Sequence, residues 1–190
     1  PDFIWQKRRN TTSSHHVTDS VRGATKLIYT EATTAEQTNA NFVKSIDSDG
    51  FTMGSADWGT SDTVVAWNWL AGGSASSNSD GSITTQVSAN TTAGFSVLTY
   101  TGNGTAGATI GHGLNQAPEA FISKVRNQTN QWHCGFAPLG WTKQIHIDTT
   151  GAAADTDIFN DTDPTSSVVT LGSGSGTNWS GNTFVAYCFH

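Results

Sequence analysis

The chain repeats itself at a spacing of 117 residues, and this repeat constrains its fold more than any other feature. Residues 1–10 align with residues 118–127, where the proline, a lysine, an arginine and the final asparagine are identical. Toward the end of each copy the spacing becomes 120, which aligns residues 63–69 with residues 183–189. Such a small drift fits loop-length variation within one fold. The sequence therefore predicts two copies of one structural unit.

The composition indicates that this unit is built from β-strands. The 190 residues include 29 Thr, 20 Ser, 13 Asn and 20 Gly, but only three Glu and one Met. Threonine favours strands and the other three favour turns, whereas long helices are rich in Ala, Leu, Glu and Lys. We predict an all-β fold of two tandem, related β-sandwich domains of jelly-roll-like type. Only short helices are expected, around residues 33–39 and 151–157.

The domain boundary is predicted from a change in composition. Residues 71–82 are rich in Gly and Ser, which is typical of a linker. We therefore expect a first domain at residues 1–82, with the linker starting at residue 71, and a second, more complete domain at residues 83–190.

The second copy begins with a lead-in that the first copy lacks. Residues 94–110 carry alternating apolar side chains around the turn Gly102-Asn103-Gly104, which predicts a β-hairpin. The first copy starts at Pro1 without such a segment, so its sheet should lack one or two strands. Upstream sequence or a neighbouring chain would then cover the open edge. Because the chain begins with Pro1 rather than Met, we expect it to be a slice of a longer repeated protein.

The closing segment of each copy has the period of a strand with a buried face. Trp67 and Trp69 alternate with smaller residues, as do Tyr187 and Phe189 at the equivalent positions. An aromatic ladder at period two predicts that these four side chains face the core.

Charge and the distribution of apolar residues exclude two classes of partner, nucleic acids and membranes. The net charge is −6 and the nine Lys and Arg are scattered, whereas nucleic-acid binding requires a basic patch. No apolar run approaches ~18 residues, so we expect no membrane insertion. Seven Trp, nine Phe and three Tyr supply enough bulk for a core, which argues against disorder.

The sequence carries none of the common catalytic motifs. It has no nucleophile elbow, no zinc-binding histidine pair and no phosphate-binding loop, so we expect no enzymatic activity and no cofactor. No metal site is expected either, because the neighbours His15 and His16 would point to opposite faces of a strand. Cys134 and Cys188 are expected to be buried free thiols, with a disulfide as the alternative.

Acidic turns offer a weaker candidate for a metal site. Residues 47–50 (Asp-Ser-Asp-Gly) resemble part of a calcium loop, but no glutamate follows at the position that would close it. Since Asp-Gly steps suit tight turns, residues 48–50 and 79–81 are predicted to be hairpin turns.

Two tryptophans in polar loops are the strongest binding candidates. Trp58 follows Asp57, Trp179 follows Asn178, and each loop precedes the closing segment of its copy. A flat indole ring can stack on a sugar while its polar neighbours bond to hydroxyl groups. The alternative is that each Trp caps the core of its own copy.

The most distinctive segments of the second copy are Phe95-Ser96-Val97, Tyr100-Thr101-Gly102-Asn103-Gly104, His112-Gly113-Leu114, Asp163-Pro164-Thr165 and Ala186-Tyr187-Cys188-Phe189. Those of the first are Pro1-Asp2-Phe3-Ile4-Trp5, Asp19-Ser20-Val21-Arg22-Gly23-Ala24 and Ser48-Asp49-Gly50-Phe51. In this order they resemble a repeated domain of tailed-phage virion proteins, known mainly from marine phages. The resemblance covers nearly the whole chain and brings no assigned active site.

The resemblance implies a component of an extracellular phage particle, such as a tail fibre, a spike or a capsid appendage. We therefore expect a non-enzymatic structural or attachment module that forms homo-oligomers, contacts other virion proteins and binds host-surface glycans. The alternative is a carbohydrate-binding module of a secreted polysaccharide-degrading enzyme, which the loop tryptophans also suit. A repeat of a cell-surface adhesin is a third hypothesis.

Overall fold

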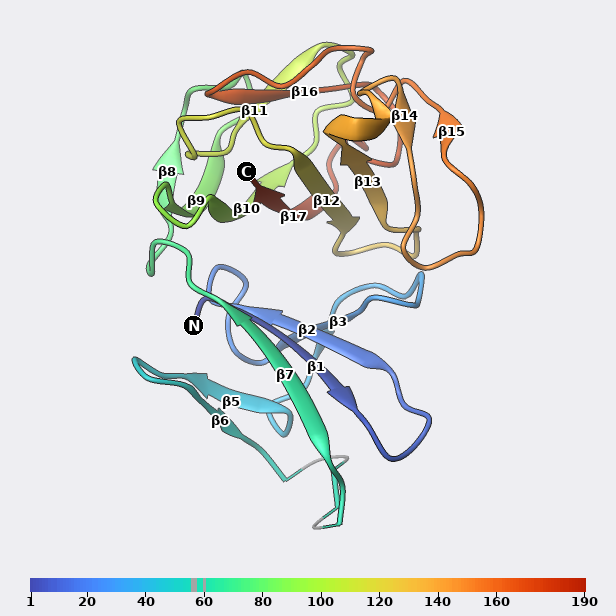
Figure 1. Cartoon of the computed structure of the whole chain (residues 1–190). Helices are drawn as coiled ribbons and strands as arrows, with labels where there is room; N and C mark the ends of the chain where they lie inside the picture. Colours follow the sequence, from blue (N-terminus) through green and yellow to red (C-terminus); the bar gives the residue numbers. More distant parts are fainter. Residues whose placement is uncertain (56–57, 60) are drawn as a thin grey trace.

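The computed structural model describes residues 1–55, 58–59 and 61–190, and it is built almost entirely from antiparallel strands. The predicted all-β fold is confirmed, because the described residues include no α-helix and a single 3-10 helix, η1 (Ala137–Leu139). Figure 1 shows two groups of strands, with the N-terminal strands below and the C-terminal strands above.

The lower group contains a five-stranded sheet, which we call the first sheet, with strand order β4-β3-β2-β1-β7. Its strands are β1 (Phe3–Arg8), β2 (His15–Asp19), β3 (Lys26–Tyr29), β4 (Gln37–Thr38) and β7 (Val64–Trp69). The hairpin of β5 (Val43–Ile46) and β6 (Phe51–Met53) lies below it (Figure 1). The turn between them confirms the prediction for residues 48–50, since the Asp47 amide donates to the Gly50 carbonyl at 2.8 Å.

The upper group contains a six-stranded sheet, the second sheet, with order β13-β12-β17-β10-β9-β8. Its strands are β8 (Ser76–Asn78), β9 (Thr85–Asn90), β10 (Phe95–Thr101), β12 (Ala120–Val125), β13 (His133–Phe136) and β17 (Thr183–Phe189). Two further pairs are β11 (Ala108–Gly111) with β16 (Val168–Leu171), and β14 (Lys143–Gln144) with β15 (Ala154–Asp155).

The strand order of the first sheet recurs in the second. β1 lies between β7 and β2, and the equivalent β12 lies between β17 and β13. The β2–β3 pairing has its counterpart in a bridge from Cys134 to Ile145, next to β14. The main difference is β10, which pairs with the outer edge of β17 and has no counterpart on β7 among the described strands. The division into domains at residues 1–82 and 83–190 remains a prediction.

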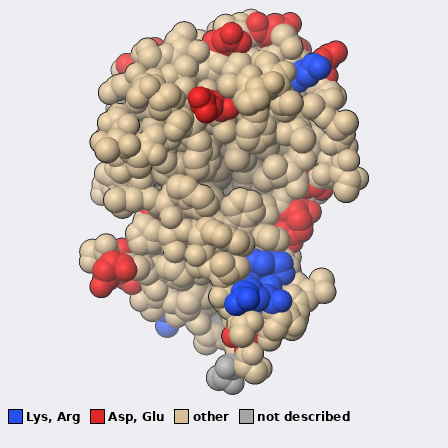
Figure 2. Space-filling model, viewed as in Figure 1, with Lys and Arg blue, Asp and Glu red and all other residues tan. Residues whose placement is uncertain are grey.

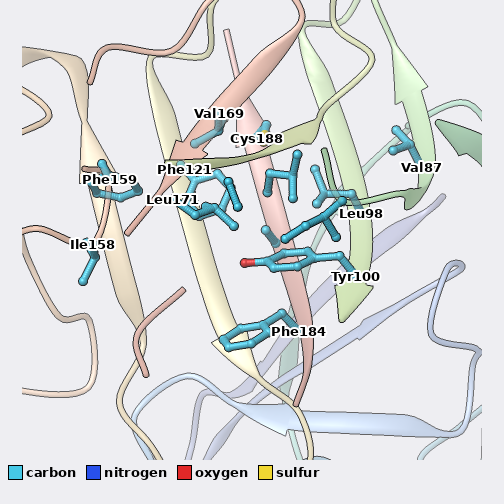
Figure 3. Close-up of a cluster of buried hydrophobic side chains, with 14 of the residues drawn as sticks. Val87, Leu98, Tyr100, Phe121, Ile158, Phe159, Val169, Leu171, Phe184 and Cys188 are labelled. Carbon is cyan, nitrogen blue, oxygen red and sulfur yellow. The ribbon is translucent and has the colours of Figure 1, made fainter. Parts of the chain in front are cut away.

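A large hydrophobic core fills the space between the second sheet and the β11–β16 pair (Figure 3). Tyr100 of β10 and Phe184 of β17 stack at a centroid distance of 5.1 Å, with their planes 8° apart. Phe121 packs edge-on against Phe159 at 5.8 Å. Each fully buried side chain of this size contributes about 1.5–3 kcal/mol to stability, so this core is a major source of stability for the second copy.

A second core, which we call the inter-sheet core, joins the two sheets face to face. Phe3 of the first sheet lies 4.8 Å from Tyr187 and 5.8 Å from Phe95, both of the second sheet. Val17 and Ile28 are buried in the same cluster. The two copies therefore share one apolar core in addition to their own contacts.

A buried ionic network also joins the copies. The Arg22 Nε donates to Asp19 Oδ2 at 2.5 Å, and one terminal nitrogen of Arg22 donates to the Tyr187 hydroxyl at 3.2 Å. Glu36 accepts from Arg22 at 3.2 Å and from two nitrogens of Arg126 at 2.9 Å. Burial opposes the charge of Arg22, but Asp19, Tyr187 and Glu36 together raise its pKa. This network links β2 and the β3–β4 loop to β17 and β12.

A buried lysine adds a second polar link between the copies. The Lys124 Nζ donates to the main-chain carbonyls of Thr33, at 2.8 Å, and of Asn130. Burial lowers the pKa of Lys124 to about 8, with the more distant charge of Asp148 acting in the opposite direction.

Three local predictions are wrong. Residues 94–110 do not form a hairpin, because β10 pairs with β9 and β17 while β11 crosses to pair with β16. Residues 33–39 and 151–157 contain the short strands β4 and β15 in place of helices. In the predicted linker, Ser76–Asn78 form β8, because pairing with β9 depends on main-chain groups and not on the small side chains.

The cysteines agree with the favoured prediction. Cys134 and Cys188 are both free and buried. Burial raises the pKa of each thiol to about 12, so both are inert in the folded chain at neutral pH.

Candidate functional site

Four aromatic side chains gather on the exposed part of the first sheet. They are Trp5 of β1, His15 of β2, and Trp67 and Trp69 of β7, and we call them the aromatic surface. Trp5 lies directly opposite Trp67 in the β1–β7 register, so both rings point to the same face of the sheet. Together the four residues line a shallow hollow of about 220 Å³.

The rings of the aromatic surface hold one another in place. The ring centroids of Trp5 and Trp67 lie 6.0 Å apart with their planes at 70°, and Trp5 meets His15 at 5.9 Å. The Trp5 indole N–H donates to His15 Nδ1 at 3.0 Å. Burial lowers the pKa of His15, which Glu31 partly offsets. The neutral His15 ring can therefore accept from Trp5 while its second nitrogen carries a proton.

Trp67 departs from its predicted place. The alternation of β7 places Trp67 and Trp69 on the same face, but their surroundings differ. Trp69 packs against Phe95 at 6.4 Å and Phe189 at 6.1 Å, next to the inter-sheet core, whereas Trp67 is 44% exposed. The prediction that Trp67 faces the core is wrong, because the second sheet covers this face only near Trp69.

An apolar crevice adjoins the aromatic surface between the two sheets. Trp5 and Trp69 form part of its wall on one side, and Ile122, Trp132 and Phe189 form part of its wall on the other. Its volume is about 120 Å³. The aromatic surface thus continues into the interior along an uninterrupted apolar wall.

Polar groups border the aromatic surface on one side. Lys7 lies opposite His15 in the β1–β2 register. Glu31 accepts a hydrogen bond from the His15 main-chain N–H at 3.0 Å. Aromatic rings that are flanked by a few fixed donors and acceptors are typical of sites that bind sugars and other amphipathic ligands. Figure 2 shows that uncharged atoms dominate this view of the molecule.

Trp58 lies elsewhere, on the opposite face of the first sheet. Its half-buried ring stacks on His16 at a centroid distance of 5.7 Å and meets Phe42 at 6.4 Å. This placement matches the alternative in which Trp58 caps the core of its own copy. Asp57, its predicted partner, lies outside the described residues.

The second predicted pair is divided between surface and interior. Trp179 is 39% exposed, but Asn178 is completely buried. The Asn178 amide donates to the carbonyls of Thr105 and Gly172 at 2.9 and 3.0 Å, and its oxygen accepts from the Asn103 N–H at 2.8 Å. Asn178 therefore connects loops through buried hydrogen bonds. Its prediction as a glycan contact is wrong, because its side chain is not accessible from the surface.

The aromatic surface was missed because its signal was divided between two observations. Period-two alternation identified the face that carries Trp67, and the absent lead-in identified an incomplete first sheet. Neither observation alone predicts that an exposed Trp67 lies beside Trp5, because Trp5 comes from a strand whose partner lies 62 residues further along the chain.

Among the described residues, no group of three or more His, Cys, Asp and Glu is arranged to hold a metal ion. In the same part of the chain, no helix is long and apolar enough to cross a membrane.

Comparison with known proteins places the chain in a family. Searches of curated proteins and of solved structures give no match. The profile of one family, described as a domain of unknown function (DUF7483), matches residues 1–190. The chain therefore belongs to the DUF7483 family.

Proposed function

We propose that this chain is a non-enzymatic structural and attachment module of a phage particle, and that its aromatic surface binds glycans of the host surface. The observation that carries the glycan-binding part is the Trp5–Trp67 pair, whose rings lie 6.0 Å apart on the exposed part of a sheet. The virion assignment is supported by the sequence resemblance and is compatible with the all-β architecture.

The chemistry of the aromatic surface suits a sugar. A pyranose ring presents C–H groups on its faces and hydroxyl groups at its rim, so it stacks on an indole and bonds to polar neighbours. Trp67 offers the exposed ring, while His15 and Lys7 lie where hydroxyl groups would project. Because the Trp5–His15 hydrogen bond fixes the rings beforehand, little conformational entropy is lost on binding.

A glycan array tests this proposal with two matched variants. The intact chain is applied to bacterial surface polysaccharides, and Trp67→Ala is expected to weaken binding at least about tenfold, the loss of one well-stacked ring. Trp179→Ala removes a ring of similar exposure, 39% against 44%, and should bind as the native chain does. An equal loss in Trp179→Ala, or no binding to any glycan, would contradict the proposal.

The same aromatic surface also suits a carbohydrate-binding module of a secreted polysaccharide-degrading enzyme. The two functions differ in ligand and in location. Selective binding to a structural polysaccharide, with no labelling of phage particles by an antibody against this chain, would favour the enzyme module over the virion protein.

A further inference from the structure

The outer edge of β7 is open, although the equivalent edge of β17 is fully paired. On β17, the residues Phe184, Ala186 and Cys188 lie opposite residues of β10 and bond to that strand. The equivalent residues of β7 are Val64, Ala66 and Asn68. Among the described residues no strand pairs with this side of β7, so their N–H and C=O groups point outward.

The β7 edge has none of the features that usually prevent strands from associating. Its sequence, Val-Val-Ala-Trp-Asn-Trp, contains no charge and no proline, and its pairing with β1 has no bulge. Val64 is 37% exposed and Trp67 is 44% exposed. An uncharged, six-residue edge with exposed apolar side chains is a template for another strand.

The other exposed edges of the described sheets are shorter or polar. β4, at the far edge of the first sheet, has two residues, and β8, at the edge of the second, has the sequence Ser-Ser-Asn. The edge that best matches β7 in length and in apolar character is therefore β7 of a second copy.

We infer that two copies of this chain associate through antiparallel pairing of their β7 strands about a two-fold axis at Ala66. In this register Ala66 faces Ala66 of the second copy, and Val64 faces Asn68, so every outward main-chain group of the three residues finds a partner. The two first sheets become one ten-stranded sheet, and a C2 contact of this kind closes at the dimer.

Charge at the two ends of β7 complements this arrangement. At one end Lys7, Arg8 and Arg9 lie opposite residues 63–65 of the chain and outnumber Asp62, which pairs with Arg8 at 3.2 Å. At the other end Asp49 shares a hollow with Asn68 and Leu70. Antiparallel pairing brings the basic end of one copy toward the acidic end of the other. Figure 2 shows basic groups near one end of the first sheet and an acidic cluster at the position of the β5–β6 turn.

The dimer would also join two aromatic surfaces. Because the two-fold axis is perpendicular to the sheet, Trp67 of one copy lies beside Val65 of the other, on the same face. Two adjacent surfaces would bind a repeating glycan more tightly than one. The pairing itself depends on main-chain groups and does not rest on glycan binding.

Sedimentation equilibrium over a range of concentrations tests the pairing. The native chain should shift from 20.1 kDa toward twice that mass. Ala66→Lys and Ala66→Glu each place like charges opposite one another, and each should weaken self-association about fivefold or more. An equal mixture of the two variants should recover the dimer, since Lys then faces Glu.

A control separates this effect from added charge alone. Leu139→Lys adds the same charge at a site that is 37% exposed and lies in η1, outside the first sheet, so it should dimerise as the native chain does. Circular dichroism should show all four proteins folded. A native chain that stays monomeric, growth beyond the dimer, or no recovery in the mixture would overturn the proposal.

Discussion

β7 and β17 are equivalent strands of the repeat, but they have opposite surroundings. β17 is paired on both edges, and five of its seven residues are buried. β7 is paired on one edge, and none of its six residues is buried. The alternation of aromatic residues is shared, so it does not set burial. Burial is determined by the neighbouring elements. β10 pairs with the outer edge of β17, and the β11–β16 pair covers one face of that strand.

The residues of the two strands reflect this difference. The buried face of β17 carries Phe184 and Cys188, whereas the same positions of β7 carry Val64 and Asn68. A polar Asn at the position of a core Cys is tolerated only where solvent or another chain can satisfy its amide. Asn68 is exposed in the first sheet, so water can satisfy its amide there.

The largest expected effect comes from placing proline at the same position of both strands. Ala186 bonds to β10 in the centre of a sheet, so Ala186→Pro removes a ladder hydrogen bond in the core and should cost more than about 4 kcal/mol of unfolding free energy. Ala66→Pro changes an outward N–H, and it should cost about 1 kcal/mol.

Urea unfolding of dilute protein measures both costs, because the chain is then monomeric. Equal losses in the two variants would mean that β7 is paired on its outer edge after all.

The next effect concerns the ionic network that ties β17 to the first sheet. Arg22→Ala leaves the Asp19 carboxylate buried without its main partner, and we expect a loss of about 3 kcal/mol in unfolding free energy. Arg9→Ala removes an exposed arginine of the same copy and should change stability by less than about 0.5 kcal/mol. Thermal unfolding compares the two variants, and a small effect of Arg22→Ala would show that the inter-sheet core and the remaining polar links hold the sheets together without Arg22.

The sequence was most informative where one local pattern determines the structure. The 117-residue repeat anticipated equivalent strands, and Asp-Gly anticipated the turn at residues 48–50. Prediction from the sequence failed where the partner strand lies far along the chain. The expected hairpin at residues 94–110 is replaced by pairing of β10 with β17 and of β11 with β16. The contact of Arg22 with Tyr187 joins residues 165 positions apart, so no local pattern could reveal it.

The candidate site illustrates the same limit. Trp58 and Trp67 both lie in the first copy with polar or small neighbours, and the sequence does not tell which of the two rings is the more exposed. Trp58 packs against His16 and Phe42, while Trp67 is exposed and the second sheet contacts its neighbour Trp69. Exposure depends on the relative position of the sheets, which is set by the inter-sheet core and the ionic network.

The smallest effect is an alkaline loss of stability that arises in the second copy. Burial raises the pKa of Cys134 and Cys188 to about 12 and raises that of Tyr100 and Tyr187. In the first copy, Val17, Asn68 and Trp67 stand at the positions of Cys134, Cys188 and Tyr187, and none of them titrates. The stability that these neutral thiols and phenols contribute is complete below the pKa of the unfolded groups and is lost as the pH rises through the folded values.

Unfolding free energy should therefore fall above about pH 9, by roughly 1.4 kcal/mol per pH unit for each thiol that ionises only in the unfolded chain. Lys124 acts in the opposite direction between about pH 8 and pH 10.5, because its lowered pKa lets the folded chain release its proton first. The two thiols and two phenols together remove more stability than Lys124 adds, so the unfolding free energy falls overall. Urea unfolding at pH 8 and pH 10.5 measures it, and Cys134→Val, which installs the residue of the first copy, should reduce the fall. An unchanged fall in this variant would place the alkaline sensitivity outside Cys134.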